Sequence, residues 1–154
     1  MNPILRSANL SDLNTLKNFQ KRLVIHERPF DPGIPKKEEV EYYDIRELIE
    51  ANNVNFLVIE IDNKIIGCGF GQIRKNDDWA ANKIFGYIGL MFVDDKFRGQ
   101  KIGKLIVDEL VKWFKEKNVF DIRLKVYEKN ISAVNAYKKY GFEHFVLEMR
   151  YTSK

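Results

Sequence analysis

Residues 87–106 read YIGLMFVDDKFRGQKIGKLI, and this stretch decides the fold. Its first part is an almost wholly apolar run that ends at Val93, which is typical of a central strand with both faces buried. Apolar residues then return at helical spacing from Ile102 to Phe114, so an amphipathic helix follows. A buried strand, a short loop and a helix in succession predict an α/β arrangement.

The loop between this strand and this helix has the features of an anion-binding turn. The first amides of a helix have no partners inside the helix and carry a partial positive charge, which suits a phosphate. Gly99 and Gly103 would let the backbone approach a ligand without an intervening Cβ. Basic side chains surround the same turn: Lys96, Arg98, Lys101 and Lys104. The spacing matches neither the P-loop nor the dinucleotide fingerprint, so an ordinary turn with solvated lysines is the alternative.

Hydrophobic periodicity predicts the other elements on either side of this stretch. Strands are expected at residues 4–6, 55–61, 64–74, 84–93, 120–127 and 142–151. Helices are expected from Ser11 onward and at residues 37–51, 102–114 and 132–140. Three prolines within residues 26–35 end the first helix, and Asp62 with Asn63 forms a tight hairpin turn. The order is β-α-α-β-β-β-α-β-α-β with a mixed sheet.

Composition excludes several classes of protein. The 154 residues are enough for one domain over residues 1–154, and 45% hydrophobic with 31% charged residues excludes a disordered chain. A single cysteine excludes an internal disulfide framework, and with only His26 and His144 we expect no metal site. No apolar run approaches the ~20 residues of a membrane span, and residues 1–13 lack a signal-peptide pattern. We therefore expect a cytoplasmic protein that does not bind membranes.

The net charge of +4 is unevenly distributed along the chain. Residues 26–62 carry 4 basic and 10 acidic side chains, whereas residues 96–154 carry 14 basic and 7 acidic ones. The basic half favours a bound anion or a nucleic acid, and solvated faces of different charge are the alternative.

A second informative segment, NISAVNAYKKYGF, spans residues 130–142. Asn130 can cap a helix or offer its amide to a ligand, and Gly141 ends that helix. Residues three or four apart share one helical face, which here holds Ala133, Ala136, Tyr137 and Tyr140. On its own this pattern fits a capped helix with a packed tyrosine better than a binding site.

Together the two segments resemble the GNAT superfamily of acetyl-CoA-dependent N-acetyltransferases. The family pattern is Arg or Gln, two residues, Gly, one residue, then Gly or Ala, and Arg98 to Gly103 follow it except that Lys101 replaces the first glycine. Residues 130–142 match the family's second element. The resemblance covers residues 84–142 and implies an α/β (α+β) fold with a mostly antiparallel central sheet and helices on both faces.

The resemblance also implies where acetyl-CoA, the co-substrate, would bind. The pyrophosphate would lie on the amides of residues 98–104, and pantetheine would run along the fourth strand where the fourth and fifth strands splay apart. The residues implied in cofactor binding are Met91, Phe92, Val93, Arg98, Gly99, Gln100, Lys101, Ile102, Gly103, Lys104, Asn130, Ala133 and Tyr137.

The implied reaction is acetyl transfer from acetyl-CoA to a primary amine by direct attack. Tyr137 would be the general acid for the leaving thiolate, and a fourth-strand amide near Phe92 would stabilise the oxyanion. An alkylamine has a reference pKa of ~10.4, so using its neutral form at pH 7 costs about 4 kcal/mol. Cys68 lies in an apolar strand and is expected to be a small core residue.

The base and the acceptor site are less well defined by the sequence. The fourth strand has no carboxylate, so the candidate bases are Glu27, Asp31 and Glu60, with bulk water as the alternative. Acceptor contacts are expected at Glu27, Phe30, Asp31 and Tyr43, in an acidic, aromatic mouth that also includes Tyr42 and Trp79. The alternating Gly67, Gly69 and Gly71 leave one face of the third strand bare, either for a packed helix or for the acceptor.

Two other functions stay open. One is an acyl-CoA-binding regulatory module without turnover, and the other is a nucleic-acid binder that uses the basic half. No recognised nucleic-acid reading motif supports the second, so the partners we expect are a small-molecule or peptide amine and no nucleic acid. The sequence also allows a homodimer.

Overall fold

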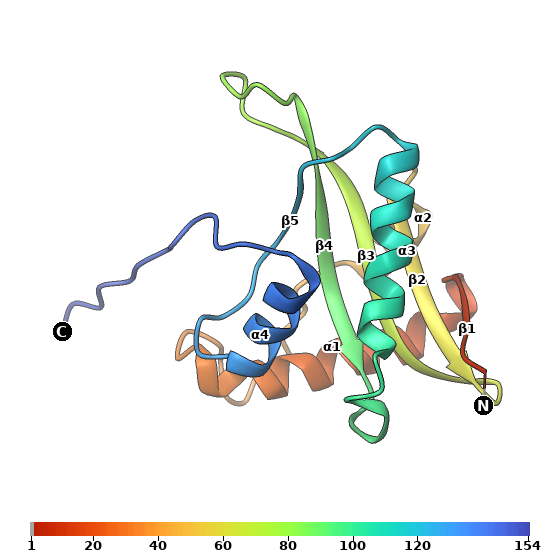
Figure 1. The fold of residues 1–154 in the computed structure, drawn as a ribbon. Coiled ribbons are helices and arrows are strands. Elements are labelled where there is room, and N and C mark those ends of the chain that lie inside the picture. The colour runs from red at the N-terminus through yellow and green to blue at the C-terminus, as the bar shows by residue number, and fades with distance from the viewer. Residues whose placement is uncertain (1) are drawn as a thin grey trace.

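The computed structural model describes residues 2–154 and has a five-stranded sheet with helices packed on both faces (Figure 1). The elements are β1 (Ile4–Ser7), α1 (Leu13–Glu27), α2 (Ile45–Glu50), β2 (Val54–Ile61), β3 (Lys64–Lys75), β4 (Ile84–Val93), α3 (Ile102–Glu116), β5 (Ile122–Leu124) and α4 (Ile131–Tyr140). Short 3-10 turns occur at η1 (Leu10–Asp12), η2 (Arg28–Phe30) and η3 (Asp95–Phe97).

The sheet is mostly antiparallel, as expected. Its order is β1-β2-β3-β4-β5, and only the β4–β5 pair is parallel. The β2–β3 hairpin turns at Asp62 and Asn63, whose φ values of 51° and 61° are those of a type I′ turn, so this prediction is confirmed.

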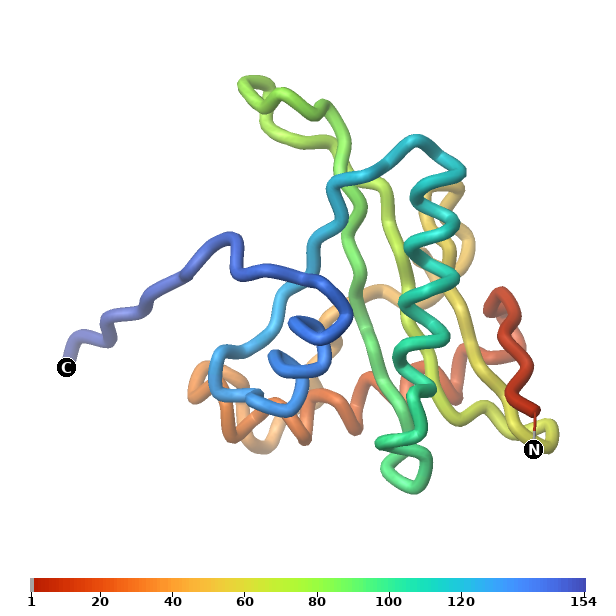
Figure 2. Tube along the Cα trace, in the orientation of Figure 1, coloured from red at the N-terminus to blue at the C-terminus, as the bar shows by residue number. Residues whose placement is uncertain are grey.

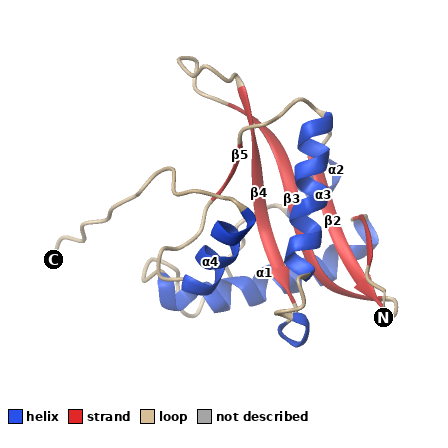
Figure 3. Cartoon of the chain, viewed as in Figure 1, coloured by secondary structure: helices blue, strands red, loops and turns tan. Residues whose placement is uncertain are grey.

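Two apolar layers form because successive residues of a strand point to opposite faces. On β2, Phe56 and Val58 belong to the layer that α1 and α2 cover, whereas Leu57 and Ile59 belong to the layer under α3. The ribbon views show α3 lying along one face of the sheet and α1 crossing the other (Figures 1 and 3).

The glycines of β3 and β4 let α3 lie close to the sheet. A Cβ at Gly71 would be 2.8 Å from Cζ of Phe114, and one at Gly86 would be 2.7 Å from Cε1 of the same ring. Phe114 is fully buried, so the bare face of β3 is filled by a packed helix rather than left for an acceptor.

The second helix is much shorter than expected. Asp44 caps α2 by accepting a hydrogen bond from the Glu47 amide at 3.1 Å, and residues 37–43 are not helical. The buried Gln20 side chain pairs with the backbone of Tyr43, accepting from its N–H at 3.0 Å and donating to its carbonyl at 3.3 Å. These two bonds hold Tyr43 against α1, and α2 begins only after its extended cap residue, Asp44.

The prediction of a closing strand at residues 142–151 is wrong, and β5 covers only Ile122–Leu124 of the expected residues 120–127. The C-terminal segment pairs with no strand of the sheet and extends away from the body (Figure 2). Alternation of apolar and polar residues predicts which face of a strand is buried. It does not predict whether a neighbouring strand is placed to pair with that segment. Within residues 2–154, no helix is both long and apolar enough to cross a membrane.

Candidate active site

The end of β4 separates from β5 and carries a bulge. Ladder pairs join the two strands at residues 86–88 of β4, and the last of these is Ile88 with Leu124. Between Gly89 and Phe92 the register with β3 shifts by one residue, and Leu90 there has a φ of 47°. Such an extra residue re-aims the backbone of the bulged strand.

The bulge decides which backbone groups face the gap beyond β5. The Asp94 amide donates to the Ile66 carbonyl at 2.8 Å, so by the antiparallel alternation the Phe92 amide also faces β3. The amides of Met91 and Val93 therefore point to the open side. The expected oxyanion donor is a fourth-strand amide near Phe92, and the neighbouring Met91 amide has this direction.

The N-terminus of α3 lies directly after this strand end and has no side-chain cap. Lys101 occupies the N-cap position with a left-handed backbone (φ 64°), and Gly99 before it has a φ of 77°. A Cβ at Gly103 would meet only Cγ2 of Val93, at 3.9 Å, so the first turn is open toward β4. Uncapped amides in an open turn next to exposed lysines fit a phosphate group.

Several side chains around this turn already have partners. Arg98 donates through Nε to the Val93 carbonyl at 3.3 Å and forms an ion pair with Asp95 at 3.0 Å. Lys104 forms an ion pair with Asp108 at 2.7 Å, and Gln100 donates to the Lys96 carbonyl at 3.4 Å. Ile102 is buried under the sheet, so only its backbone faces the turn.

Helix α4 brings Tyr137 to the same region. Asn130 caps this helix by accepting the Ala133 amide at 3.4 Å, so any ligand contact would use its other amide atom. The Tyr137 ring packs edge-on against Phe142, with centroids 5.7 Å apart. Burial, with a smaller effect from the negative charge of Glu27, raises the pKa of Tyr137 to about 12. Its hydroxyl is therefore protonated at neutral pH and can act as a donor.

Glu27, the last residue of α1, is a carboxylate whose negative charge acts on the Tyr137 hydroxyl. Burial raises the pKa of the Glu27 carboxyl above its usual range, and the charge of Asp31 acts in the same direction. The buried Tyr42 hydroxyl lies beside Glu27 and Tyr127, and its interaction with the Glu27 carboxylate partly opposes this rise in pKa.

Asp31 is engaged in a different way from Glu27. It accepts hydrogen bonds from the Gly33 amide at 2.8 Å, from the Tyr127 hydroxyl at 2.8 Å and from Arg150 at 2.9 Å. These donors, the Gly33 amide first, lower the pKa of Asp31. Asp31 thus joins three parts of the chain and is poorly suited to take up a proton. Neither Tyr127 nor Arg150 was expected at the site, because they lie 96 and 119 residues from Asp31 in sequence.

Aromatic rings complete this region. The Tyr43 hydroxyl lies 3.2 Å from that of Tyr87, and the ring of Tyr43 packs edge-on against Phe70. Phe30 lies between His26 and Tyr127, with ring centroids 5.7 and 6.3 Å away.

Glu60 and Trp79, which were expected near the site, lie elsewhere in the structure. Glu60 accepts from Arg6 at 2.7 Å in a cluster with Asp12 at the β1 edge. Trp79 is almost fully exposed in the loop that extends from the far ends of β3 and β4, so it does not wall the acceptor site (Figure 1). Cys68 is fully buried, and burial raises the pKa of its thiol, so it is a core residue as expected.

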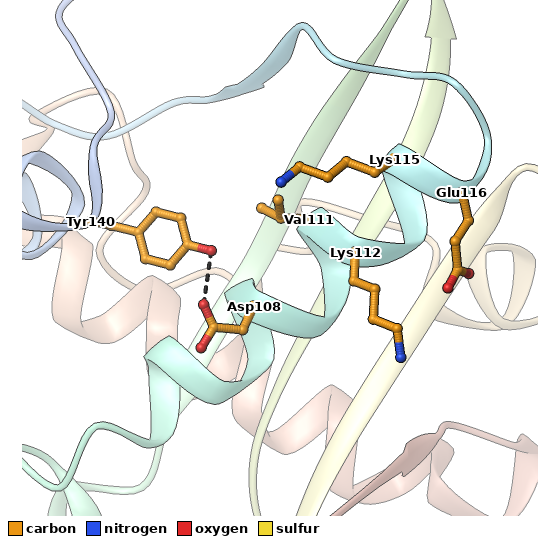
Figure 4. A pocket seen from close by; sticks show the side chains of 6 residues that line it. All are labelled: Asp108, Val111, Lys112, Lys115, Glu116 and Tyr140. Atoms are coloured by element: carbon orange, nitrogen blue, oxygen red, sulfur yellow. Dashed lines mark hydrogen bonds between the residues drawn. The ribbon is translucent and has the colours of Figure 1, made fainter.

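A shallow hollow of about 500 Å³ on the flank of α3 lies outside this region (Figure 4). It is lined by Asp108, Val111, Lys112, Lys115, Glu116 and Tyr140. The Tyr140 hydroxyl donates to Asp108 at 2.9 Å, which ties α4 to α3 across the hollow.

The sequence model of the acetyltransferase (GNAT) family matches residues 21–142, which include the α3 turn, Tyr137 and Glu27. The chain belongs to this family. The expected family and the expected fold are thereby both confirmed.

Relatives of the GNAT chain carry acetyltransferase names. An N-acetyltransferase of Methanocaldococcus jannaschii is 27% identical over 119 residues, covering 75% of this chain and 51% of the relative. An N-alpha-acetyltransferase of Sulfurisphaera tokodaii is 25% identical and covers 90% of this chain and 79% of the relative. The chain thus spans about half of the Methanocaldococcus protein.

Solved structures give the same result. A predicted acetyltransferase from Clostridium acetobutylicum, whose structure was determined with acetyl-CoA, superposes with a TM-score of 0.73 at 25% identity, and the match covers 97% of this chain and 96% of that one. No group of three or more metal-binding side chains occurs in residues 2–154.

Proposed function

We propose that this protein transfers the acetyl group of acetyl-CoA to a primary amine by direct attack. The observation that carries the proposal is the uncapped, open first turn of α3 at the end of a bulged strand that has separated from its neighbour. A helix N-terminus can hold a pyrophosphate, and a free strand edge can pair with an amide-containing arm such as pantetheine. Both occur here within one continuous stretch, residues 91–104.

Each cofactor contact follows from this arrangement. The pyrophosphate would accept hydrogen bonds from the backbone of residues 98–104, with the exposed Lys96 and Lys101 adding positive charge. Pantetheine would pair with the backbone of Met91 and Val93. Asn130, Ala133 and Tyr137 of α4 would line the opposite side of the gap.

Tyr137 would assist the departure of the thiolate. The amine nitrogen bonds to the acetyl carbon, the C–S bond then breaks, and its electron pair stays on sulfur. A protonated hydroxyl with a pKa of about 12 stabilises that sulfur by donating a hydrogen bond and then a proton. The Met91 amide would hold the oxyanion before this step.

Glu27 would accept the proton that the amine must lose. Its raised pKa makes it a better proton acceptor than an exposed glutamate, and its charge is felt at Tyr137. For a neutral amine, the proton accepted by Glu27 and the one lost by Tyr137 balance, so exchange with water restores both groups; a cationic amine must first release one further proton to water. The Tyr42 hydroxyl, which is buried beside Glu27, would contact the acceptor there.

The acceptor site would be formed by Glu27, Phe30, Asp31 and Tyr43 together with Tyr42. Aromatic rings beside a carboxylate favour a cationic amine. An α-amino group, with a pKa of ~7.7–8.0, is neutral in roughly a tenth of molecules at pH 7 and demands less of the base than a lysine. The Sulfurisphaera relative is named for acetylation of α-amines, so α-amino peptides are the first acceptors to test.

The experiment is titration calorimetry with acetyl-CoA, followed by thiol release against α-amino peptides, alkylamines and lysine peptides. Binding with amine-dependent release is the expected result and would identify the acceptor class. Binding without release from any amine would favour an acyl-CoA-binding module. Absence of binding would overturn the proposal and return attention to the basic surface.

A further inference from the structure

The groups that the proposed reaction must align lie on two different elements. Glu27 ends α1, whereas Met91 and Val93 lie at the end of β4. α1 crosses the face of the sheet on which the Phe92 side chain is buried (Figures 1 and 3). The contact between α1 and β4 therefore sets the position of Glu27 relative to a thioester bound along β4. A misplacement of about 1 Å can cost on the order of 10²-fold in rate.

Phe92 makes the first part of this contact. Its ring stacks on the ring of Phe19 with centroids 4.6 Å apart, and the guanidinium carbon of Arg22 lies 4.9 Å from the centroid of the same Phe92 ring. A guanidinium this close to an aromatic ring is attracted by the electrons of that ring. Glu27 follows Arg22 by five residues, or roughly 7.5 Å along the helix axis.

Asp94 makes the second part of the contact. One of its carboxylate oxygens accepts from Nη1 of Arg22 at 3.2 Å, and the other accepts from the Lys96 amide at 3.1 Å and caps η3. Its own backbone amide donates to the Ile66 carbonyl of β3 at 2.8 Å. Asp94 thus joins Arg22 both to the sheet and to the turn that leads to α3.

Arg22 therefore contacts the residues on both sides of Val93, the last residue of β4. A planar guanidinium can lie against an aromatic ring and donate hydrogen bonds at the same time. The ion pair is also partly shielded from water, because the side chains of Arg22 and Asp94 are 34% and 15% exposed. Salt screens such a pair less than it screens a fully exposed one.

We propose that Arg22 is a positioning residue for acetyl transfer. By holding Phe92 and Asp94, it fixes the end of β4 against α1, so that the Met91 amide and the bound thioester keep their position relative to Glu27. The inference rests on the proposed function, and it assigns Arg22 no contact with either substrate.

The first test is the kinetics of amine-dependent thiol release. Arg22→Met keeps an apolar side chain against Phe92 but removes the charge. We expect kcat to fall roughly 10-fold or more, because the reacting groups lose their alignment. The KM for the amine and the Kd for acetyl-CoA should stay within about a factor of three, because the residues that contact the substrates are unchanged.

Two further variants control for charge and for folding. Arg22→Lys returns a positive charge to the site and should bring kcat to within about threefold of the parent value. Lys21→Met, at the neighbouring position of α1, removes an exposed ion pair with Glu39 of 3.5 Å and should leave kcat unchanged. Arg22 lines an open hollow of about 730 Å³, so its substitution should not prevent folding. An equal number of acetyl-CoA molecules bound per chain in calorimetry shows that no inactive fraction lowers kcat.

The second test asks whether Arg22 acts through Asp94. Asp94→Asn removes the charge from the other side of the ion pair, and asparagine can still cap η3. Asp94→Asn should lower kcat, and the double variant with Arg22→Met should be no slower than Arg22→Met alone, because both changes break one link. Losses that multiply in the double variant would show that the two side chains act separately and would overturn the inference.

The third test needs no acetyl-CoA. The Asp94 amide donates to Ile66, so its hydrogen exchange, measured by NMR, reports opening of the β4 end. Exchange at Asp94 should be at least about 10-fold faster in Arg22→Met and unchanged in Lys21→Met. Unchanged exchange in Arg22→Met would overturn the inference whether or not the protein is active.

The kinetic outcomes separate this inference from the proposed function. An active parent protein with equal kcat in Arg22→Met and Lys21→Met would overturn the inference alone. A parent protein that binds no acetyl-CoA would contradict the proposed function and, with it, the inference.

Discussion

Tyr137 and Tyr140 lie one turn apart on α4 but have different surroundings. The Tyr140 hydroxyl donates to Asp108 on α3, whereas burial and the charge of Glu27 determine the pKa of Tyr137. Tyr137→Phe should lower amine-dependent thiol release roughly 10²-fold or more, because a positioned general acid contributes about that much. Acetyl-CoA affinity should stay within a factor of about two. Tyr140→Phe is the matched control, and equal turnover in the two variants would remove Tyr137 from the mechanism.

Glu27 offers a prediction in which activity and stability change in opposite directions. Its carboxyl has a raised pKa in the folded protein, so the folded state binds more protons than the unfolded state between the two pKa values. The protonated Glu27 carboxyl contributes its full stability below the pKa that it has in the unfolded state. This contribution is lost as the pH rises through the pKa that it has in the folded state. Glu27→Gln should therefore raise Tm at pH 7 and leave it nearly unchanged at pH 4.

The same variant should lose turnover together with the acidic limb of the pH–rate profile. That limb should lie above the ordinary glutamate range in the parent protein, because the deprotonated carboxylate is the active form. Glu38→Gln, at an exposed position, is the control and should change neither quantity. An unaltered acidic limb in Glu27→Gln would assign the base to solvent.

Lys101 stands where the family pattern has glycine, and its backbone is left-handed. A side chain in this left-handed conformation costs about 1–2 kcal/mol, which glycine would avoid. Glycine also makes the unfolded chain more flexible, and this lowers the net gain in stability by about 0.5–1 kcal/mol. Lys101→Gly should therefore raise the free energy of unfolding by about 0.5–1 kcal/mol. Asn118→Gly, at another left-handed position, should gain less because asparagine tolerates this region. Urea denaturation of both variants measures the difference.

At the scale of elements, the contact between α3 and the sheet limits side-chain size. Gly86→Ala would place a Cβ 2.7 Å from the fully buried Phe114 ring and should cost about 1–3 kcal/mol of stability by overpacking. Gly103→Ala, in the open first turn of the same helix, should instead be neutral or stabilising by up to about 1 kcal/mol. Equal destabilisation by the two substitutions would contradict this account of the helix packing.

The elements also show which features the sequence alone can predict. The hairpin turn at Asp62 and Asn63, the α3 face and the end of α4 at Gly141 depend on neighbours in sequence, and each was predicted. The start of α2 follows Tyr43, whose backbone is held by Gln20, 23 residues before it, and this start was missed. The cluster of Asp31, Tyr127 and Arg150 joins even more distant residues, so local patterns contain no trace of it.

The site residues divide in the same way. The turn at residues 98–104 and the position of Tyr137 follow from local spacing plus the family resemblance. Gly86 and Gly89 are consistent with a bulge in the fourth strand, but its position at Leu90, which sets the direction of the Phe92 amide, depends on the pairing with β3. Among the three candidate bases, the choice of Glu27 over Asp31 and Glu60 rests on tertiary contacts that only the folded chain provides.

For the whole molecule, acetyl-CoA should add contacts that connect α4 to the end of β4 and to the first turn of α3. β4, α3 and α4 surround the gap beyond the last β4–β5 ladder pair, so a molecule bound there adds contacts that the unfolded chain lacks. A ligand at 100 times its Kd stabilises the folded state by about 2.7 kcal/mol, which is a Tm increase of roughly 5–10 °C for a chain of this length. Differential scanning fluorimetry measures this shift.

Two comparisons test whether the contact between the pyrophosphate and α3 provides this stabilisation. Acetyl-pantetheine, which lacks the pyrophosphate, should give a much smaller Tm shift at the same concentration, because the α3 amides would have no anion to bind.

Gly103→Glu should fold normally, since a carboxylate in the first turn of a helix is favourable. It should nevertheless lose the Tm shift with acetyl-CoA, because its charge repels the pyrophosphate. Higher salt should weaken binding to the parent protein in the same direction. If Gly103→Glu kept the full shift, the pyrophosphate would have to lie away from α3, and the basic turn would be a solvated surface.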